Sequence, residues 1–311
     1  MSTITPDGRP KLPTFLIIGA AKAGTTALAA WLEQHPEIYF TPFKEPMFFA
    51  REGMELDFAG PGDLRLPIEC INNLRDYEAQ YDGVRNEKAM GEKSTCYLRS
   101  PDAAARIKHY VPNVKLVAVL RDPAARAFSH FMHFIRDDRE PLRDFEKALD
   151  QEPGRIAAKW EASWQYQETG FYHRQLSRYY ALFPREQIRV YLHEDLRKPD
   201  ALLPDLFRYL GVDPSFEPQT EGRHNASGVP KNRSLHEWLM YPNWPKWILK
   251  RVLPSALFLK LKRLQLWAVN RNLVSQNIQA PALARLRALY REDTLRLQEL
   301  IGRDLSKWLT T

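Results

Sequence analysis

Lysine, glycine and threonine residues near the N-terminus are spaced in a way that could bind an anion. The run from Gly19 to Thr26 reads GAAKAGTT, follows a short apolar stretch and opens a helix-like one. Glycines let the backbone approach a ligand closely, and the first N–H groups of a helix point toward an anion bound there. We expect the Lys22 ammonium over the reacting end of the ligand, with a phosphate held behind it by Ala23, Gly24, Thr25 and Thr26.

The position of the lysine argues against a nucleotide kinase. A kinase-type loop places lysine directly after the second glycine, whereas that position is Thr25 here and Lys22 stands two residues before Gly24. The next apolar stretch ends in Arg121, where such a kinase would carry its magnesium-binding acid, and Asp122 comes one step late. No histidine and cysteine cluster has the spacing of a zinc site. The sequence therefore predicts chemistry without a metal ion.

Arg121 and Ser129 form a second candidate anion site. Arg121 follows the apolar stretch Lys115 to Leu120, and ligands of α/β folds bind at the carboxyl ends of strands. Ser129 comes about two helical turns later and can face the same anion. Two other interpretations are an ion pair between Arg121 and Asp122 and a plain surface hydroxyl at Ser129. Their joint occurrence favours anion binding.

Strand-like and helix-like segments alternate around these residues. Strands are expected at Thr14–Ile18, Ala89–Thr95, Lys115–Leu120 and Gln187–Leu192, and helices at Thr25–Gln34, Ala124–Ile135 and Tyr172–Phe183. From Pro199 onward the pattern is mostly helical, including a long run from Pro281 to Leu309. The alternation indicates an α/β fold, with a P-loop-type central parallel sheet flanked by helices and helical C-terminal additions. We expect a single domain over 1–311, with its core at about 14–210 and a helical C-terminal part at about 234–311.

Two motifs in the right order resemble those of sulfotransferases that use 3'-phosphoadenosine-5'-phosphosulfate (PAPS). The run Phe15 to Thr26 resembles their 5'-phosphosulfate loop, and Arg121 to Ser129 resembles their 3'-phosphate motif, in which the arginine and the serine bind the 3'-phosphate. The resemblance covers about Phe15 to Leu210, and it is closer to heparan-sulfate-type and related bacterial enzymes than to cytosolic small-molecule ones. It implies transfer of a sulfuryl group from PAPS to a hydroxyl or amine, with release of 3'-phosphoadenosine-5'-phosphate (PAP).

The resemblance also suggests catalytic residues. Glu45 stands in FKEPMFF, at the place of an acid followed by an aromatic pair, and is expected to be the general base in a partly apolar setting. Lys93, in GEKSTCY, matches a lysine at the end of the next strand, where it can neutralise the transferring group or orient the acceptor. Lys231 and Arg233 are candidates for a basic loop that closes over the 3'-phosphate. His133 is the next choice as the base.

Other functions and partners stay open at this stage. A P-loop nucleotide kinase or phosphotransferase and a non-catalytic PAP-binding protein are the rivals. The net charge of +7 suits binding of anionic small molecules or polysaccharides, or is ordinary solvated basic surface. The acceptor is expected to be a small molecule, a glycan or a lipid, and no nucleic acid partner is expected. The basic segment Trp244 to Leu266 has a competing interpretation as a peripheral membrane contact, although a packed helix is favoured.

The compartment is predicted from the cysteines and the N-terminus. Only Cys70 and Cys96 occur, too few for a disulfide framework, which favours a reducing compartment. The stretch Met1 to Thr14 is polar and lacks the apolar core of a signal peptide. We therefore expect a cytoplasmic protein.

Overall fold

The computed structural model describes residues 12–63, 70–220, 229–232, 271–274 and 276–310, together with residues 238, 257, 261, 264, 265 and 268. Within these residues no helix is both long and apolar enough to cross a lipid bilayer. Most of the segment 244–266, which the sequence left open as a membrane contact, lies outside the described residues. Arg233 also lies outside them.

A five-stranded parallel sheet forms the centre of the fold. Its strands are β1 (Phe15–Gly19), β2 (Ile38–Phe40), β3 (Ala89–Lys93), β4 (Lys115–Leu120) and β5 (Ile188–Leu192), in the order β2-β3-β1-β4-β5. With β1 in the middle, the loop after it lies beside the loops that follow β3 and β4. The carboxyl ends of parallel strands meet at one edge, so these three loops can build one site.

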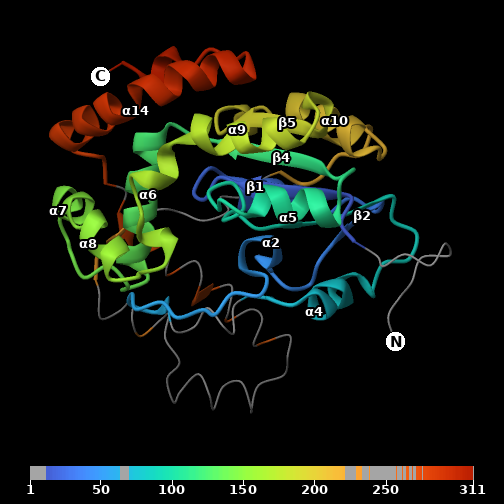
Figure 1. The fold of residues 1–311 in the computed structure, drawn as a ribbon, viewed down its shortest axis with the longest axis horizontal. Helices are drawn as coiled ribbons and strands as arrows, with labels where there is room; N and C mark the ends of the chain where they lie inside the picture. Colours follow the sequence, from blue (N-terminus) through green and yellow to red (C-terminus); the bar gives the residue numbers. More distant parts are fainter. Residues whose placement is uncertain are drawn as a thin grey trace.

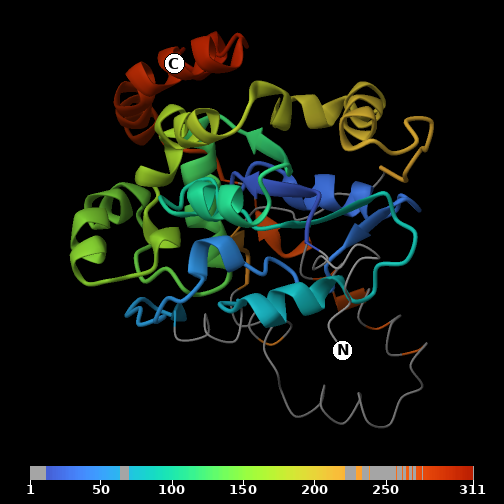
Figure 2. The same cartoon turned by 45° about the vertical axis from the view of Figure 1, so that its right-hand side comes forward.

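Helices surround the sheet. They are α1 (Thr25–Leu32), α2 (Phe48–Arg51), α4 (Leu74–Glu78), α5 (Ala103–Tyr110), α6 (Pro123–Arg136), α7 (Phe145–Asp150), α8 (Glu152–Ala157), α9 (Tyr172–Leu182), α10 (Pro199–Leu210) and α14 (Ala280–Ile301). The long helix α14 packs against α9 and forms the outermost layer, while α4 lies on the opposite side of the molecule (Figures 1 and 2). A short antiparallel pair of β6 (Val229–Pro230) and β7 (Leu273–Val274) lies next to α6.

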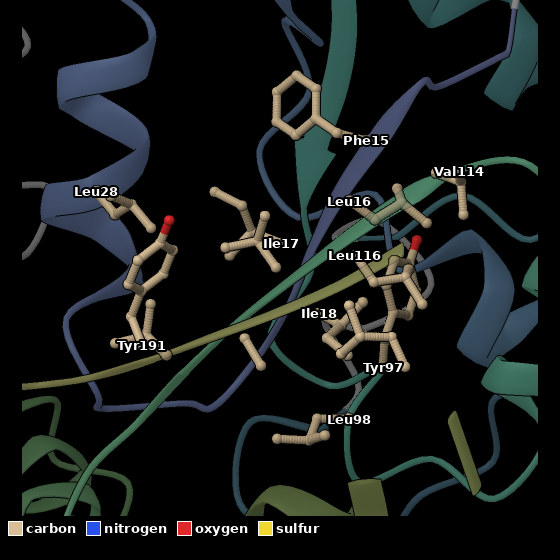
Figure 3. Packing of buried hydrophobic residues seen from close by; sticks show 14 of the residues in the cluster. Phe15, Leu16, Ile17, Ile18, Leu28, Tyr97, Leu98, Val114, Leu116 and Tyr191 are labelled. Atoms are coloured by element: carbon tan, nitrogen blue, oxygen red, sulfur yellow. The ribbon is translucent and has the colours of Figure 1, made fainter. Parts of the chain in front are cut away.

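Apolar strands hold the sheet in the core. All five residues of β1 and the last five of β4 are buried, as expected for central strands covered on both faces. Figure 3 shows Ile17 on the side of Leu28 and Tyr191, and Ile18 on the side of Tyr97. This two-sided packing fixes where β1 ends, and therefore where the glycine-containing loop begins.

The expected α/β class is confirmed, and β4 has the expected bounds. The other expected strands and helices are present, with ends shifted by a few residues. Shifts of this size are usual, because element ends are the least sharply defined parts of secondary structure. The strand β2 and the helix α5 were not expected. β2 has only three residues, Ile38 to Phe40, and this is too short to show an alternating pattern.

Candidate active site

The loop between β1 and α1 is held in a fixed shape by one glycine and one histidine. Gly24 has a φ of 101°, which favours glycine, and it is the N-cap residue immediately before α1. A Cβ atom on Gly24 would lie 2.3 Å from Leu196 Cδ1 and 3.1 Å from His193 Nδ1. His193 follows β5, and its Nδ1 lies 2.9 Å from the Ala23 carbonyl oxygen. A carbonyl only accepts, so Nδ1 carries the proton and ties the loop to the sheet edge.

Lys22 is the lysine of this loop, and its environment changes its acidity. Its backbone has a φ of 66°, in the left-handed region. Burial, and next the nearby Arg136 guanidinium, lower the pKa of Lys22 to about 8. At neutral pH the side chain is therefore mostly an ammonium, although it is easier to deprotonate than an ordinary lysine.

Arg121 contacts the same loop, and Ser129 lies on α6, the helix that begins two residues after Arg121. The Arg121 Nη1 donates to the Lys22 carbonyl oxygen at 3.2 Å. Ser129 on α6 is 6% exposed, and its Oγ has no hydrogen-bond partner among the described residues. Among the described residues the ion-pair partner of Asp122 is Arg287, at 3.8 Å, and not Arg121; Asp122 also caps α6 by accepting from the Ala124 and Ala125 amides at 2.8 and 3.2 Å. The arginine and the serine are therefore both available to an anion.

These residues line one central cleft with a volume of about 590 Å³. Its wall includes the expected residues Lys22, Gly24, Thr25, Thr26, Glu45, Arg121 and Ser129. It also includes Arg99, His133, Arg136, Arg139, Glu161 and His193. Cations outnumber acids in this wall, so the central cleft is suited to a ligand with several negative charges. Ala23 is buried, and its carbonyl oxygen is the one that meets His193.

Glu45 lies in the central cleft, but its setting differs from the expected one. Its Oε1 accepts from the Lys93 ammonium at 2.6 Å. Its Oε2 accepts from the Thr95 hydroxyl at 2.9 Å and from the Thr95 amide at 3.3 Å. The expectation of a partly apolar setting is therefore wrong for the carboxylate itself, since its partners are polar. The aromatic residues Phe48 and Phe49 are instead buried in the core.

The histidine considered as the next choice for the base is already engaged. Arg136 Nη2 lies 2.7 Å from His133 Nδ1, and a guanidinium only donates. The proton of neutral His133 is therefore on Nε2, which lies 3.5 Å from Asp137 Oδ2. Burial, and next the charge of Lys22, lower the pKa of His133. Because its lone pair on Nδ1 is used by Arg136, His133 is poorly placed to accept a further proton.

A buried ion triad forms another part of the wall. Glu161 pairs with Arg99 at 2.7 Å and also with Arg51. The two guanidiniums hold the pKa of Glu161 below its usual range despite burial, which acts in the opposite direction. One negative charge between two positive ones leaves the triad with a net positive charge beside the cleft.

Several cleft residues were not found from the sequence. His193 directly follows β5, at the strand end where ligands of α/β folds bind, so a signal existed. Arg136 is seven residues after Ser129 on α6 and shares its face, which helical spacing could also have shown. Arg99, Arg139 and Glu161 come from irregular segments and gave no such signal. Lys231 is exposed beside the β6–β7 pair, where its amide donates to the Asn272 carbonyl oxygen at 2.6 Å.

Known proteins with related sequences and structures match this architecture. Residues 13–218 match the model of the sulfotransferase family. A bifunctional heparan sulfate N-deacetylase/N-sulfotransferase 3 from Mus musculus is 29% identical over 218 residues, which cover 66% of this chain and 23% of that protein. Heparan sulfate glucosamine 3-O-sulfotransferase 3A1 from Homo sapiens is 29% identical over 188 residues, covering 60% of this chain and 41% of that protein.

A solved structure gives a comparison over nearly the whole chain. A sulfotransferase from Alicyclobacillus acidocaldarius is 33% identical, with a TM-score of 0.76, and the match covers 96% of this chain and 100% of that one. The chain spans well under half the length of the two heparan sulfate enzymes that it matches. The family match extends from two residues before β1 past the end of α10 and includes every strand of the central sheet. The chain therefore belongs to the sulfotransferase family.

Proposed function

We propose that this protein transfers a sulfuryl group from PAPS to a hydroxyl or amine of a small-molecule, glycan or lipid acceptor, without a metal ion, in the cytoplasm. The observation that carries the proposal is the central cleft, where Lys22, Arg121 and Ser129 are brought together with the Glu45 carboxylate. Lys22, Arg121 and Ser129 can bind the anionic groups of a donor. The Glu45 carboxylate can accept the proton that an acceptor loses. The central cleft therefore contains residues for binding the donor and for deprotonating the acceptor.

The residues of the central cleft fit PAPS as the donor. The buried Ser129 Oγ lacks a partner among the described residues, and the Arg121 guanidinium lines the same cleft. We assign these two side chains to the 3'-phosphate. The start of α1 at Gly24, Thr25 and Thr26 provides amides and hydroxyls for the 5'-phosphate. Lys231 is assigned to the loop that closes over the nucleotide, as is Arg233.

The chemistry requires charge stabilisation and removal of one proton. PAPS supplies the sulfuryl group when bound. Lys22 provides positive charge where the phosphate oxygen departs, and electrostatic stabilisation of this kind is usually the largest catalytic contribution. Glu45 accepts the proton of the acceptor, while Lys93 and Thr95 fix the orientation of its carboxylate.

Arg121→Ala should weaken binding of PAP much more than binding of adenosine-5'-phosphosulfate, which lacks the 3'-phosphate. A charge-assisted hydrogen bond contributes about 1.5–3 kcal/mol, so the loss for PAP should be about 10- to 150-fold. Isothermal titration calorimetry with both ligands measures the difference. Arg143→Ala, at an arginine with a half-exposed side chain, is the matched control. Equal weakening of both ligands would show that Arg121 does not read the 3'-phosphate.

Removal of divalent metal should leave turnover unchanged. We assign the stabilisation of charge during sulfuryl transfer to side chains of the protein. The described residues hold no group of three or more histidine, cysteine, aspartate or glutamate residues suited to a metal ion. The rate of PAP release is measured with excess EDTA and with added magnesium. Rates that agree within error support the proposal, while a requirement for magnesium would restore the phosphotransferase alternative.

A further inference from the structure

A fully buried acid lies at the end of β3, next to Lys93. Glu92 is 0% exposed and does not line the central cleft. Its Oε1 accepts from the Tyr97 hydroxyl at 2.6 Å and from the Tyr77 hydroxyl at 3.3 Å. Its Oε2 accepts from the Ser94 hydroxyl at 2.8 Å. Three hydroxyls thus surround a carboxyl for which the proposed function has no role.

The surroundings of Glu92 are buried and aromatic. Tyr77 stacks on Phe48 with ring centroids 4.5 Å apart, and its hydroxyl lies 3.3 Å from that of Tyr81. Burial raises the pKa of Glu92 to about 7, against the lowering effect of its hydroxyl partners and with a small addition from the Glu45 charge. The titratable groups that face it are Tyr77 from α4, Tyr81 from the turn after α4, Tyr97 and Glu45. A carboxyl buried in this way costs stability, so a compensating use is expected.

The Ser94 hydroxyl connects Glu92 to the loop that carries Glu45. The Met47 amide donates to Ser94 Oγ at 2.9 Å, and Ser94 in turn donates to Glu92. Glu45 and Met47 both have left-handed backbones, with φ values of 53° and 58°. Such residues are strained and persist only where the surrounding structure holds them. Among the described contacts, the hydrogen bond to Ser94 Oγ is the one that holds the Met47 amide in place.

The loop that carries Glu45 is held by four consecutive residues, Glu92 to Thr95, two through its side chain and two through its backbone. Lys93 and Thr95 bind the Glu45 carboxylate directly. Glu92 and Ser94, which are both fully buried and alternate with them, fix the backbone two residues further on. Glu92 and Lys93 are the last two residues of β3, where successive side chains point to opposite faces, and Ser94 and Thr95 follow the strand directly.

We propose that Glu92 is a positioning residue for Glu45: through the Ser94 hydroxyl it fixes the Met47 amide and holds the left-handed turn that presents Glu45 to the central cleft. The inference rests on the proposed function in assigning Glu45 as the base. The contacts of Glu92 with the loop do not depend on that assignment. Two measurements therefore test the two statements separately.

Amide hydrogen exchange tests the structural part without any acceptor. In Ser94→Ala the Met47 amide should exchange about tenfold faster, as expected for the loss of one ordinary hydrogen bond. Glu92→Met keeps the volume but removes the acceptors, and should have the same effect. Glu92→Gln keeps an oxygen that can accept from Ser94 and should stay within about twofold of the wild type. The Leu98 amide, which donates to the Ile18 carbonyl oxygen, serves as the reference.

Unchanged Met47 exchange in Ser94→Ala would overturn the positioning role. Equal acceleration at Met47 and Leu98 would also overturn it, because it would indicate general loosening. If Glu92→Met does not fold, Ser94→Ala and Glu92→Gln still decide the question, since they predict opposite results at the same amide.

A double-mutant cycle tests the functional part. Ser94→Ala should lower kcat about tenfold in the wild type but have no further effect in Glu45→Gln, with PAP affinity unchanged in both. An equal loss of kcat in the two backgrounds would show that Ser94 and Glu92 do not act through Glu45. If Glu45→Gln itself has normal kcat, the proposed base is wrong, and Met47 exchange still decides whether Glu92 holds the turn.

Discussion

Lys22→Ala should lower turnover by about 10²–10³-fold, the usual cost of removing one group that stabilises transition-state charge. PAP binding should persist, because Arg121 and Ser129, which we assign to the 3'-phosphate at the other end of the nucleotide, line the same cleft. The measurement is kcat for PAP release beside the PAP dissociation constant. Lys44→Ala, at an exposed lysine beside Glu45, is the matched control and should have nearly normal kcat.

The pH dependence provides a second test of the same residue. The pKa of Lys22 is lowered to about 8, so the ammonium is present below this pH and is lost above it. In the free enzyme, kcat/KM should therefore fall as the pH rises through about 8. Lys22→Arg should keep the charge and move this fall to higher pH. Near-normal kcat in Lys22→Ala, or an unchanged profile in Lys22→Arg, would remove Lys22 from the mechanism.

Glu45→Gln should lower kcat by about 10²–10⁴-fold, the range of a general base. The amide keeps nearly the same size, and its oxygen can still accept from Lys93, as Glu45 Oε1 does now. Only the capacity to take a proton is lost. PAP affinity, measured by calorimetry, should therefore change little, so that binding and chemistry separate.

Glu33→Gln, at an exposed acid just after α1, is the control for Glu45→Gln and should leave kcat unchanged. Normal turnover in Glu45→Gln with the true acceptor would require another base. His133 would be a weak replacement, since Arg136 already donates to its Nδ1. Such a result would also argue against the heparan-sulfate-type assignment of this carboxylate.

The parts of the site that follow strand ends could be predicted from the sequence. Arg121 comes directly after the buried strand β4, Lys22 lies in the loop that follows the buried strand β1, and parallel strands bring their carboxyl ends to one edge. Ser129 followed from helical spacing after Arg121. These positions follow from the apolar pattern of the strands, from helical spacing and from the parallel arrangement of the sheet. Their convergence in one cleft could therefore be expected.

The polar contacts of Glu45 could not be predicted in the same way. Its partner Lys93 is 48 residues away, and the pairing depends on two left-handed residues in a short irregular loop. The arginines of the ion triad come from different places, since Arg51 ends the short helix α2 and Arg99 lies in an irregular segment, and they meet at Glu161. Sequence periodicity carries no information on contacts of this kind, because they depend on how loops pack in three dimensions.

Transfer of label from PAPS carrying a labelled sulfuryl group tests the central claim most directly. The protein is incubated with this donor, excess EDTA and a panel of sugar, lipid, phenol and amine acceptors, and the products are identified by mass spectrometry. We expect one acceptor class to gain the labelled sulfuryl group, with one PAP released for each product formed and loss of transfer in Lys22→Ala. Label that moves only when magnesium is supplied, or PAPS that stays intact and unbound in every reaction, would contradict the account.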